Sequence, residues 1–221
     1  EIMPSLVGSE MCIRDSCEGI YQNSKILLNG EMIDERPYGY AAYYISLSEH
    51  LHSGENEIEI IAANADTPNT RYYSGAGIYR NINLLTAGES YILPDGVRIS
   101  TTNNDTVHIK TEMHGTGSVH VSVYEDNVVV AEGNGNDVTL KIPNAKTWDE
   151  ESPFLYSCKV ELIESGKSLD SVTKRFGIRT LVWNGNGFLV NGKNTLLRGA
   201  CVHHDNGILG ACSFSCLLYT S

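Results

Sequence analysis

Residues 118–133, SVHVSVYEDNVVVAEG, carry the pattern that decides the fold. Apolar and polar residues alternate along the first half, and Asp126-Asn127 separates it from a second apolar run. Side chains of a strand point alternately to its two faces, so each run predicts a half-buried β-strand. Similar short runs, joined by Gly, Asn and Asp, recur from 97 to 180 and predict about seven strands. Roughly ninety residues of this kind predict an immunoglobulin-like β-sandwich, by architecture alone because no Cys…Trp…Cys pattern is present.

The residues before this block also predict strands. The segment 25–33, KILLNGEMI, places Asn29-Gly30 between two apolar runs. This dipeptide supplies the positive φ angles of a two-residue hairpin turn. Further alternating runs extend to residue 87, and a linker near 87–96 separates them from the second block. The first block therefore predicts part of another antiparallel sandwich.

The last part of the chain has a different hydrophobic pattern. A hairpin is predicted around Asn191-Gly192, and the apolar side chains of Leu196, Leu197 and Ala200 follow with little polar alternation. Such a strand is covered on both faces, as in a parallel sheet or a barrel. No segment predicts a helix clearly.

The composition excludes some partners. The 221 residues carry a net charge of -11, whereas nucleic acids and anionic membranes select for basic patches, so we expect neither as a partner. The six cysteines form no regular framework, which argues against a disulfide scaffold. Residues 1–16 and 216–221 resemble the translation of sequencing-adapter read-through, and we interpret both as foreign to the protein. Residues 1–16 also lack the features of a signal peptide, so the compartment stays open.

The strongest candidate for chemistry is the cluster of Cys201, His203, His204 and Asp205. A zinc site takes three or four ligands, usually from more than one element, and the remaining histidines are scattered. A Cys–His dyad lacks an orienting third group. Two interpretations remain: a buried strand with hydrogen-bonded histidines, or the polar end of a barrel strand, where ligands bind.

Two other polar stretches need an interpretation. Residues 64–80, NADTPNTRYYSGAGIYR, place Arg71 beside two tyrosines and a Gly-rich turn, a combination suited to holding sugars, although packing explains the tyrosines equally. The stretch has no lysine and no following helix for a phosphate cradle. Residues 147–156, TWDEESPFLY, hold three adjacent acidic residues, which predict a solvated, rigid turn because paired catalytic carboxylates come from separate strands.

Taken in order, several motifs resemble glycoside hydrolase family 2, most closely its bacterial β-galactosidases. They are GIYQNSKILLNG, RPYGY, LHSGENEIEI, NTRYYSGAGIYRNINL, TWDEESPFLY, RFGIRT and GFLVNGKNTLLRGACVHHDNGILGA. The resemblance implies a mostly β chain: a partial jelly-roll sandwich, an immunoglobulin-like β-sandwich and the first strand of a (β/α)8 barrel. The implied domain boundaries are 17–88 for the C-terminal part of a jelly-roll sugar-binding domain, 89–180 for the immunoglobulin-like sandwich and 181–215 for the truncated start of the catalytic barrel.

The resemblance also implies an activity. Family members hydrolyse a terminal β-glycosidic bond with retention, using two glutamates from later barrel strands as acid/base and nucleophile. The motifs that carry these glutamates are absent from this chain, so we expect both beyond Ser221, assign no catalytic residue and expect the chain alone to be inactive. The parent is expected to take a β-linked sugar, with Mg²⁺ or Na⁺ and an oligomeric state both possible there. The compartment stays unknown, with a bacterial cytoplasm or periplasm as the alternatives.

Residue roles follow by the same resemblance. His203 would contact sugar hydroxyls, with His204 and Asp205 as neighbours in the same pocket, and Asn69 and Arg71 would reach the substrate from the preceding loop. β-Glucuronidase and β-mannosidase share this architecture, so the sugar stays open. A stand-alone module that binds carbohydrate or protein is the alternative, although such a module does not need the apolar strand within 181–211.

Overall fold

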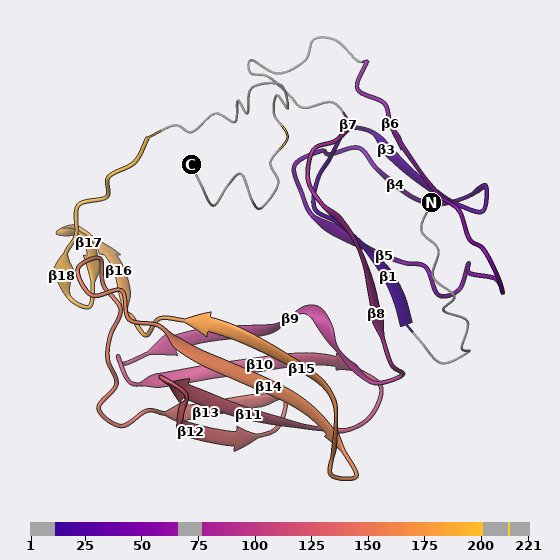
Figure 1. Ribbon diagram of the computed structural model, residues 1–221. Coiled ribbons are helices and arrows are strands. Elements are labelled where there is room, and N and C mark those ends of the chain that lie inside the picture. Colours follow the sequence, from indigo (N-terminus) through magenta and orange to yellow (C-terminus); the bar gives the residue numbers. More distant parts are fainter. Residues whose placement is uncertain (1–11, 66–76, 201–211, 213–221) are drawn as a thin grey trace. The chain divides into compact units, whose positions relative to one another are not determined.

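The computed structural model describes residues 12–65, 77–200 and 212, and these contain strands and no helix (Figure 1). The chain divides into two compact units, one formed by 1–87 with 200–221 and the other by 88–199. Among the described residues, no helix is long and apolar enough to cross a membrane.

The first unit contains eight described strands. They are β1 (Cys12–Cys17), β2 (Ile20–Tyr21), β3 (Ser24–Leu28), β4 (Glu31–Arg36), β5 (Tyr43–Ser46), β6 (Ile58–Ala62), β7 (Gly77–Ile78) and β8 (Ile82–Ala87). They form antiparallel sheets in the orders β5-β1-β8, β4-β3-β6 and β2-β7. Ile26 and Leu28, which alternate with exposed Lys25 on β3, are fully buried in the core between the sheets. This confirms the predicted jelly-roll-type sandwich with period-2 burial.

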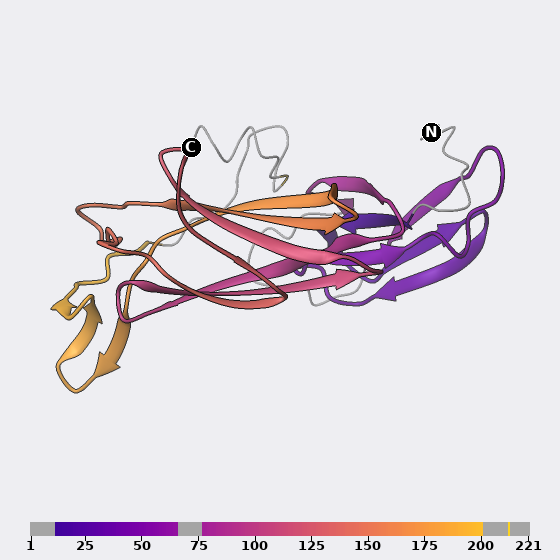
Figure 2. The same cartoon turned by 90° about the horizontal axis from the view of Figure 1, so that it is seen from below.

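The second unit contains a sandwich of two antiparallel sheets, seen edge-on in Figure 2, followed by a third sheet of β16 (Leu181–Asn184), β17 (Gly187–Val190) and β18 (Lys193–Asn194). The strands of the sandwich are β9 (Tyr91–Thr102), β10 (Thr106–His114), β11 (Ser118–Glu125), β12 (Val128–Asn134), β13 (Asp137–Lys141), β14 (Tyr156–Glu164) and β15 (Lys167–Phe176). The order is β13-β10-β9 in one sheet and β12-β11-β14-β15 in the other. This three-plus-four arrangement confirms the predicted immunoglobulin-like architecture.

The two predicted hairpin turns are confirmed. Asn29 and Gly30 have φ angles of 53° and 82°, and they join β3 to β4. Asn191 and Gly192 have φ angles of 51° and 81°, and they join β17 (Gly187–Val190) to β18 (Lys193–Asn194). Positive φ at both central residues is what a type I′ turn requires, and Asn and Gly adopt it at low cost.

At the edges of the second sandwich, one prediction differs from the structure and another is not confirmed. The expected linker is part of β9, because Tyr91 and Ile92 are buried and pair with β10 across a bulge. The expected barrel strand is not formed in its described part: residues 195–200 lie outside every strand, and Leu196 and Leu197 are 73% and 63% exposed. A strand needs partners for its backbone N–H and C=O groups along its length. Within the described ranges, the segment's backbone is held at Thr195, whose amide donates a hydrogen bond to the Phe188 carbonyl at 2.8 Å.

Candidate functional site

The residues predicted to contact substrate fall outside the described part of the chain. His203, His204 and Asp205 lie in 201–211, and Asn69 and Arg71 lie in 66–76. Their roles therefore stay predictions. The structure does describe the residues on both sides of segment 66–76.

The catalytic carboxylates are likewise not assigned to any described residue. The structure describes nothing after residue 212, so Ser221, beyond which the acid/base and nucleophile glutamates are expected, lies outside the described ranges as well. The placement of both glutamates beyond Ser221 therefore stays a prediction.

Both ends of segment 66–76 are held beside β2. Before it, the Ala63 amide donates a hydrogen bond to the Gln22 carbonyl at 2.9 Å. After it, β7 pairs with β2, with Gly77 opposite Tyr21 and Ile78 opposite Ile20. The chain thus leaves and re-enters next to the same strand, and the two ends of the segment that holds Asn69 and Arg71 are anchored at this edge of the first unit.

Four tyrosine rings gather at the same edge, and we call them the tyrosine platform: Tyr21, Tyr38, Tyr40 and Tyr79. Ring centroids lie 5.1 Å apart for Tyr21–Tyr40, 5.8 Å for Tyr38–Tyr40 and 6.3 Å for Tyr40–Tyr79, with tilted or edge-on geometry. These are favourable separations for aromatic pairs. Sequence reasoning missed the platform, although the motif RPYGY and the tyrosine of GIYR were its signals.

Two glycines let the inner rings of the platform pack closely. A Cβ at Gly39 would lie 2.5 Å from the Tyr21 ring, and a Cβ at Gly19 would lie 2.6 Å from the Tyr79 ring. The Tyr79 hydroxyl donates a hydrogen bond to the Gly39 carbonyl at 2.8 Å. Burial raises the pKa of Tyr79, so this hydroxyl stays protonated and available as a donor at neutral pH. The rings of Tyr21 and Tyr79 are therefore held by close contacts with these two glycines.

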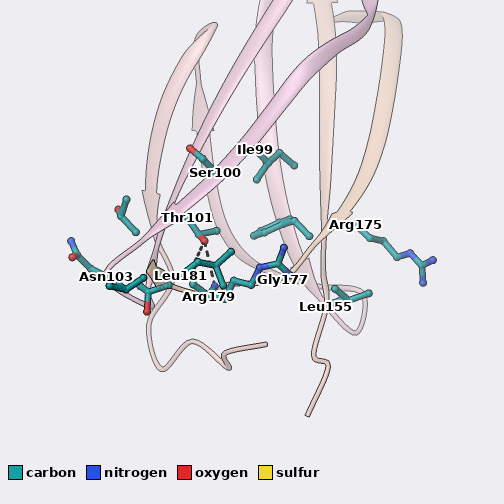
Figure 3. A pocket seen from close by; sticks show the side chains of 13 residues that line it. Ile99, Ser100, Thr101, Asn103, Leu155, Arg175, Gly177, Arg179 and Leu181 are labelled. Carbon is teal, nitrogen blue, oxygen red and sulfur yellow. Dashed lines mark hydrogen bonds between the residues drawn. The ribbon is translucent and has the colours of Figure 1, made fainter. Parts of the chain in front are cut away.

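The second unit contains a pocket of about 840 Å³ at the end of the sandwich where β9 and β15 meet β16 (Leu181–Asn184) (Figure 3). Its polar centre is Thr101, whose hydroxyl donates to the Arg179 carbonyl at 2.9 Å and accepts from the Arg179 amide at 3.3 Å. The Arg179 guanidinium lies 4.6 Å from the Trp148 ring centroid. Its apolar wall includes exposed Leu155 and Leu181. These contacts brace the junction between the sandwich and the hairpin that follows.

The acidic stretch 149–151 forms a turn, as its sequence predicts. The Asp149 carboxylate accepts hydrogen bonds from the amides of Glu151 at 3.0 Å and Ser152 at 2.7 Å. Glu151 pairs with Lys193 at 3.2 Å, and both side chains are well exposed. These carboxylates stabilise the loop and do not form a facing pair of the kind that catalyses glycoside hydrolysis.

Cys17 and Cys158 are buried thiols, and His108 is part of a sheet. Burial raises the pKa of Cys158 to about 11, and burial together with the Asp15 carboxyl raises that of Cys17 to about 12, so neither is a thiolate at neutral pH. His108 bridges two threonine hydroxyls at 2.9 and 3.0 Å, which makes it a cross-strand sheet residue. Within the described ranges, no three His, Cys, Asp or Glu side chains group in a way that suits a metal ion.

Comparison with known proteins places these features in a family context. The family model of Glycosyl hydrolases family 2 matches residues 96–179, most of the second sandwich. A β-galactosidase of Bacteroides ovatus is 32% identical over 88% of this chain and 26% of its own length. A putative β-glucuronidase of Formosa agariphila is 30% identical over 87% of this chain and 20% of its own length. The chain thus spans between a fifth and about a quarter of the length of these relatives.

Solved structures agree with this similarity. The crystal structure of a glycosyl hydrolase family 2 member from Bacteroides cellulosilyticus superposes with a TM-score of 0.82 at 28% identity, covering 92% of this chain and 29% of that one. An FMN-binding β-glucuronidase from Faecalibacterium prausnitzii has a TM-score of 0.83 at 21% identity, which reflects the shared fold. The similarity therefore extends across both units.

Proposed function

The chain belongs to glycosyl hydrolase family 2, and from this premise we propose that it supplies the sandwich domains and part of the sugar site of a retaining exo-β-galactosidase. The catalytic acid and nucleophile of such an enzyme are two carboxylates about 5 Å apart, contributed by separate elements. The pocket between β9, β15 and β16 is lined by no Asp or Glu, and we place both glutamates beyond Ser221, outside this chain.

The observation that carries the proposal is the extent of the match. Similarity to a β-galactosidase and to putative β-glucuronidases runs over nearly nine-tenths of the chain, through both sandwiches, whereas a module borrowed by unrelated proteins would match over one of them. Fold alone would not justify the activity, since sandwiches serve many functions. Sequence identity at this coverage supports our proposal that the parent protein shares the family's chemistry.

Five residues would contact the sugar in this proposal. His203, with His204 and Asp205 beside it, would bind hydroxyls of the terminal galactose, and Asn69 and Arg71 would approach from segment 66–76. A neutral imidazole has one donor and one acceptor nitrogen, so His203 can hydrogen-bond hydroxyl groups in either sense. Such bonds accelerate the reaction when they are stronger in the transition state than in the ground state.

A chimera tests the proposal. Residues 17–211 would replace the matching part of the Bacteroides ovatus β-galactosidase, which supplies the rest of the enzyme. We expect the chimera to hydrolyse nitrophenyl β-galactoside and the purified 221-residue chain to show no turnover. Enzyme-dependent turnover by the chain alone would contradict the placement of the glutamates. A folded chimera without activity would favour a stand-alone binding module.

The identity of the sugar needs a second comparison. β-Glucuronidase is the second candidate activity because a putative β-glucuronidase matches almost as well, at 30% against 32% identity. The full-length parent enzyme, expressed from its natural gene, would be assayed on nitrophenyl β-galactoside, β-glucuronide and β-mannoside. A preference for galactoside of at least about tenfold in kcat/KM supports the proposal, and a preference for glucuronide or mannoside replaces it.

A further inference from the structure

Asparagine followed directly by glycine is a chemically reactive pair, and the chain contains six such dipeptides. Asn206-Gly207 lies outside the described residues. The structure describes the other five: Asn29-Gly30, Asn134-Gly135, Asn184-Gly185, Asn186-Gly187 and Asn191-Gly192. They differ in the hydrogen bonds of the asparagine side chain and of the glycine nitrogen, and these bonds decide which pair can react.

The reaction is the loss of the side-chain amide. The glycine nitrogen forms a bond to the asparagine Cγ, and the bond between Cγ and Nδ2 breaks. Nδ2 leaves as ammonia with the proton that the glycine nitrogen gives up, and a cyclic succinimide remains. Water then opens the ring at either of its carbonyl carbons, which yields aspartate or isoaspartate. In the net reaction the chain consumes water, releases ammonia and gains a carboxylate.

The asparagines of two dipeptides are held by hydrogen bonds at both ends of the carboxamide. Asn29 Oδ1 accepts from the Glu57 amide at 3.0 Å, and its Nδ2 donates to Asn56 Oδ1 at 2.9 Å. Asn191 has a backbone partner on each side in the same way. Both bonds must break before Cγ can turn toward the following nitrogen, so these two asparagines are protected.

A third dipeptide is protected at the attacking nitrogen. The Gly135 amide donates a hydrogen bond to the Val119 carbonyl at 2.9 Å. The Asn134 side chain is also engaged, with Oδ1 2.9 Å from Nδ1 of His120. Neither the nucleophile nor the carboxamide of this pair is free.

The pair Asn184-Gly185 has the opposite arrangement. It lies at the turn between β16 and β17, both residues are exposed, and a Cβ at Gly185 would meet no atom within 4 Å. Within the described ranges, neither the Gly185 amide nor Nδ2 of Asn184 donates a hydrogen bond. The attacking nitrogen and the leaving group are therefore both free of competing contacts.

The remaining contact of the Asn184 side chain favours the reaction. The Asn186 amide donates a hydrogen bond to Asn184 Oδ1 at 2.8 Å. Because Gly185 lies between these two residues, the bond turns the carboxamide back toward the Gly185 backbone. It also places a donor on the oxygen that gains negative charge when a nitrogen adds to Cγ, and such a donor stabilises the transition state.

We propose that Asn184 is a site of spontaneous deamidation, at which the Gly185 nitrogen displaces ammonia from Cγ and the Asn186 amide stabilises the developing oxyanion. The reaction needs only the chain and water, so the proposal does not rest on the proposed glycosidase activity. Holding two reacting groups side by side is itself a large source of rate.

The neighbouring dipeptide Asn186-Gly187 lacks this arrangement, although its sequence is equally reactive. No hydrogen bond among the described residues turns the Asn186 side chain toward Gly187. The Asn186 carbonyl accepts from Nδ2 of Asn194 at 2.6 Å, which holds the peptide group that contains the Gly187 nitrogen. We therefore expect Asn184 to react before Asn186.

Deamidation would alter the hairpin that it occurs in. Asn184 is paired with Gly187, next to the pair of Trp183 and Phe188, whose ring centroids lie 5.6 Å apart. Isoaspartate routes the backbone through the former side chain and so lengthens it at the turn. We expect this to disturb the strand pairing, which would be seen as a shift of the Trp183 indole resonance.

Peptide mapping by mass spectrometry tests the proposal, after incubation of the purified 221-residue chain at neutral and at mildly alkaline pH. Each protecting hydrogen bond slows attack about two- to tenfold, so Asn184 should react at least about fourfold faster than Asn29, Asn134 and Asn191. Both aspartate and isoaspartate should form, faster at the higher pH because the attacking nitrogen must lose its proton. In the urea-unfolded chain, the same asparagines should react at similar rates.

Gly185→Ala is the decisive variant, because the φ angle of Gly185 lies outside the left-handed region and a Cβ has open space there. It should slow deamidation of Asn184 at least about twofold, since alanine restricts the backbone rotation that brings the nitrogen to Cγ. Gly88→Ala is the matched control: Gly88 has equally open surroundings, and its replacement should leave the rate at Asn184 unchanged.

Four results would each overturn the proposal. They are a rate at Asn184 no higher than at the protected asparagines, earlier reaction at Asn186, aspartate as the sole product, and an unchanged rate in Gly185→Ala. Aspartate alone would mean direct hydrolysis by water, without attack by the Gly185 nitrogen.

Discussion

Replacement of Asp15 by valine is expected to stabilise the first unit. Asp15 lies on β1 between β5 and β8 and is 2% exposed, and its Oδ2 atom has no hydrogen-bond partner among the described residues. Burial raises the pKa of this carboxyl, and a hydrogen bond from the Ser16 backbone offsets only part of the cost. A buried polar group without a partner costs about 1–3 kcal/mol. Valine removes that group and suits an interior strand.

We therefore expect Asp15→Val to raise the free energy of unfolding of the first unit by about 1–3 kcal/mol at pH 7. Urea denaturation followed by NMR of first-unit amides would measure it separately from the second unit. Glu59→Val is the matched control, because Glu59 is an exposed strand residue of β6 and its replacement should change stability by no more than about 0.5 kcal/mol. An unchanged or lower stability in Asp15→Val would refute the assignment of an uncompensated carboxyl.

The pH dependence gives an independent check on the same residue. Because the pKa of Asp15 is raised in the folded state, the folded chain binds the proton more tightly than the unfolded chain. The contribution of Asp15 is then fully favourable below the unfolded pKa of about 3.9, and it is lost as the pH rises through the folded pKa. Asp15→Asn should flatten this decline in first-unit stability between pH 4 and neutrality, whereas an unchanged slope would assign the decline to other groups.

Two further substitutions test the local packing. Asn191→Ala should loosen the β17–β18 hairpin, because the Asn191 side chain accepts a hydrogen bond from the Thr180 amide at 3.0 Å and donates one to the Trp148 carbonyl at 3.1 Å. We expect the hairpin to lose about 1–3 kcal/mol of local stability, measured as faster hydrogen exchange at the Thr180 amide. Unchanged exchange would contradict this expectation. Gly39→Ala should destabilise the first unit by about 1–3 kcal/mol, because its Cβ would lie 2.5 Å from the Tyr21 ring; unchanged denaturation would show that the ring can move aside.

Much of the fold could be predicted from the sequence because its signals are local. Strict alternation fixed the strands of the second unit, and Asn29-Gly30 and Asn191-Gly192 fixed two turns through their positive φ angles. The start of β9 could not be predicted, because its pairing with β10 depends on residues about twenty positions away and on a bulge. Local turn residues there suggested a linker, and tertiary pairing overrode them.

The tyrosine platform could not be predicted from the sequence. The tyrosine platform joins residues from β2, the RPYGY turn and the end of β7, and only the folded sheet brings them together. The burial of Asp15 could not be predicted from its residue type either. Its charge predicts exposure, whereas its place on β1 puts it in the interior. Residues 12–16, which we interpret as foreign to the protein, lie in β1 and pair with β8, and the interpretation stays a prediction.

The most direct test of the account is the kcat/KM for nitrophenyl β-galactoside of the chimera with the Bacteroides ovatus enzyme, with and without His203→Ala. His120→Ala is the control, because His120 is held by Asn134 and Ser122 within the second sandwich. We predict an active chimera, a loss of about 10²–10³ in kcat/KM for His203→Ala, as for removal of a transition-state hydrogen-bond donor, and parent-like activity for the control. An active chimera that is indifferent to His203→Ala would contradict the account.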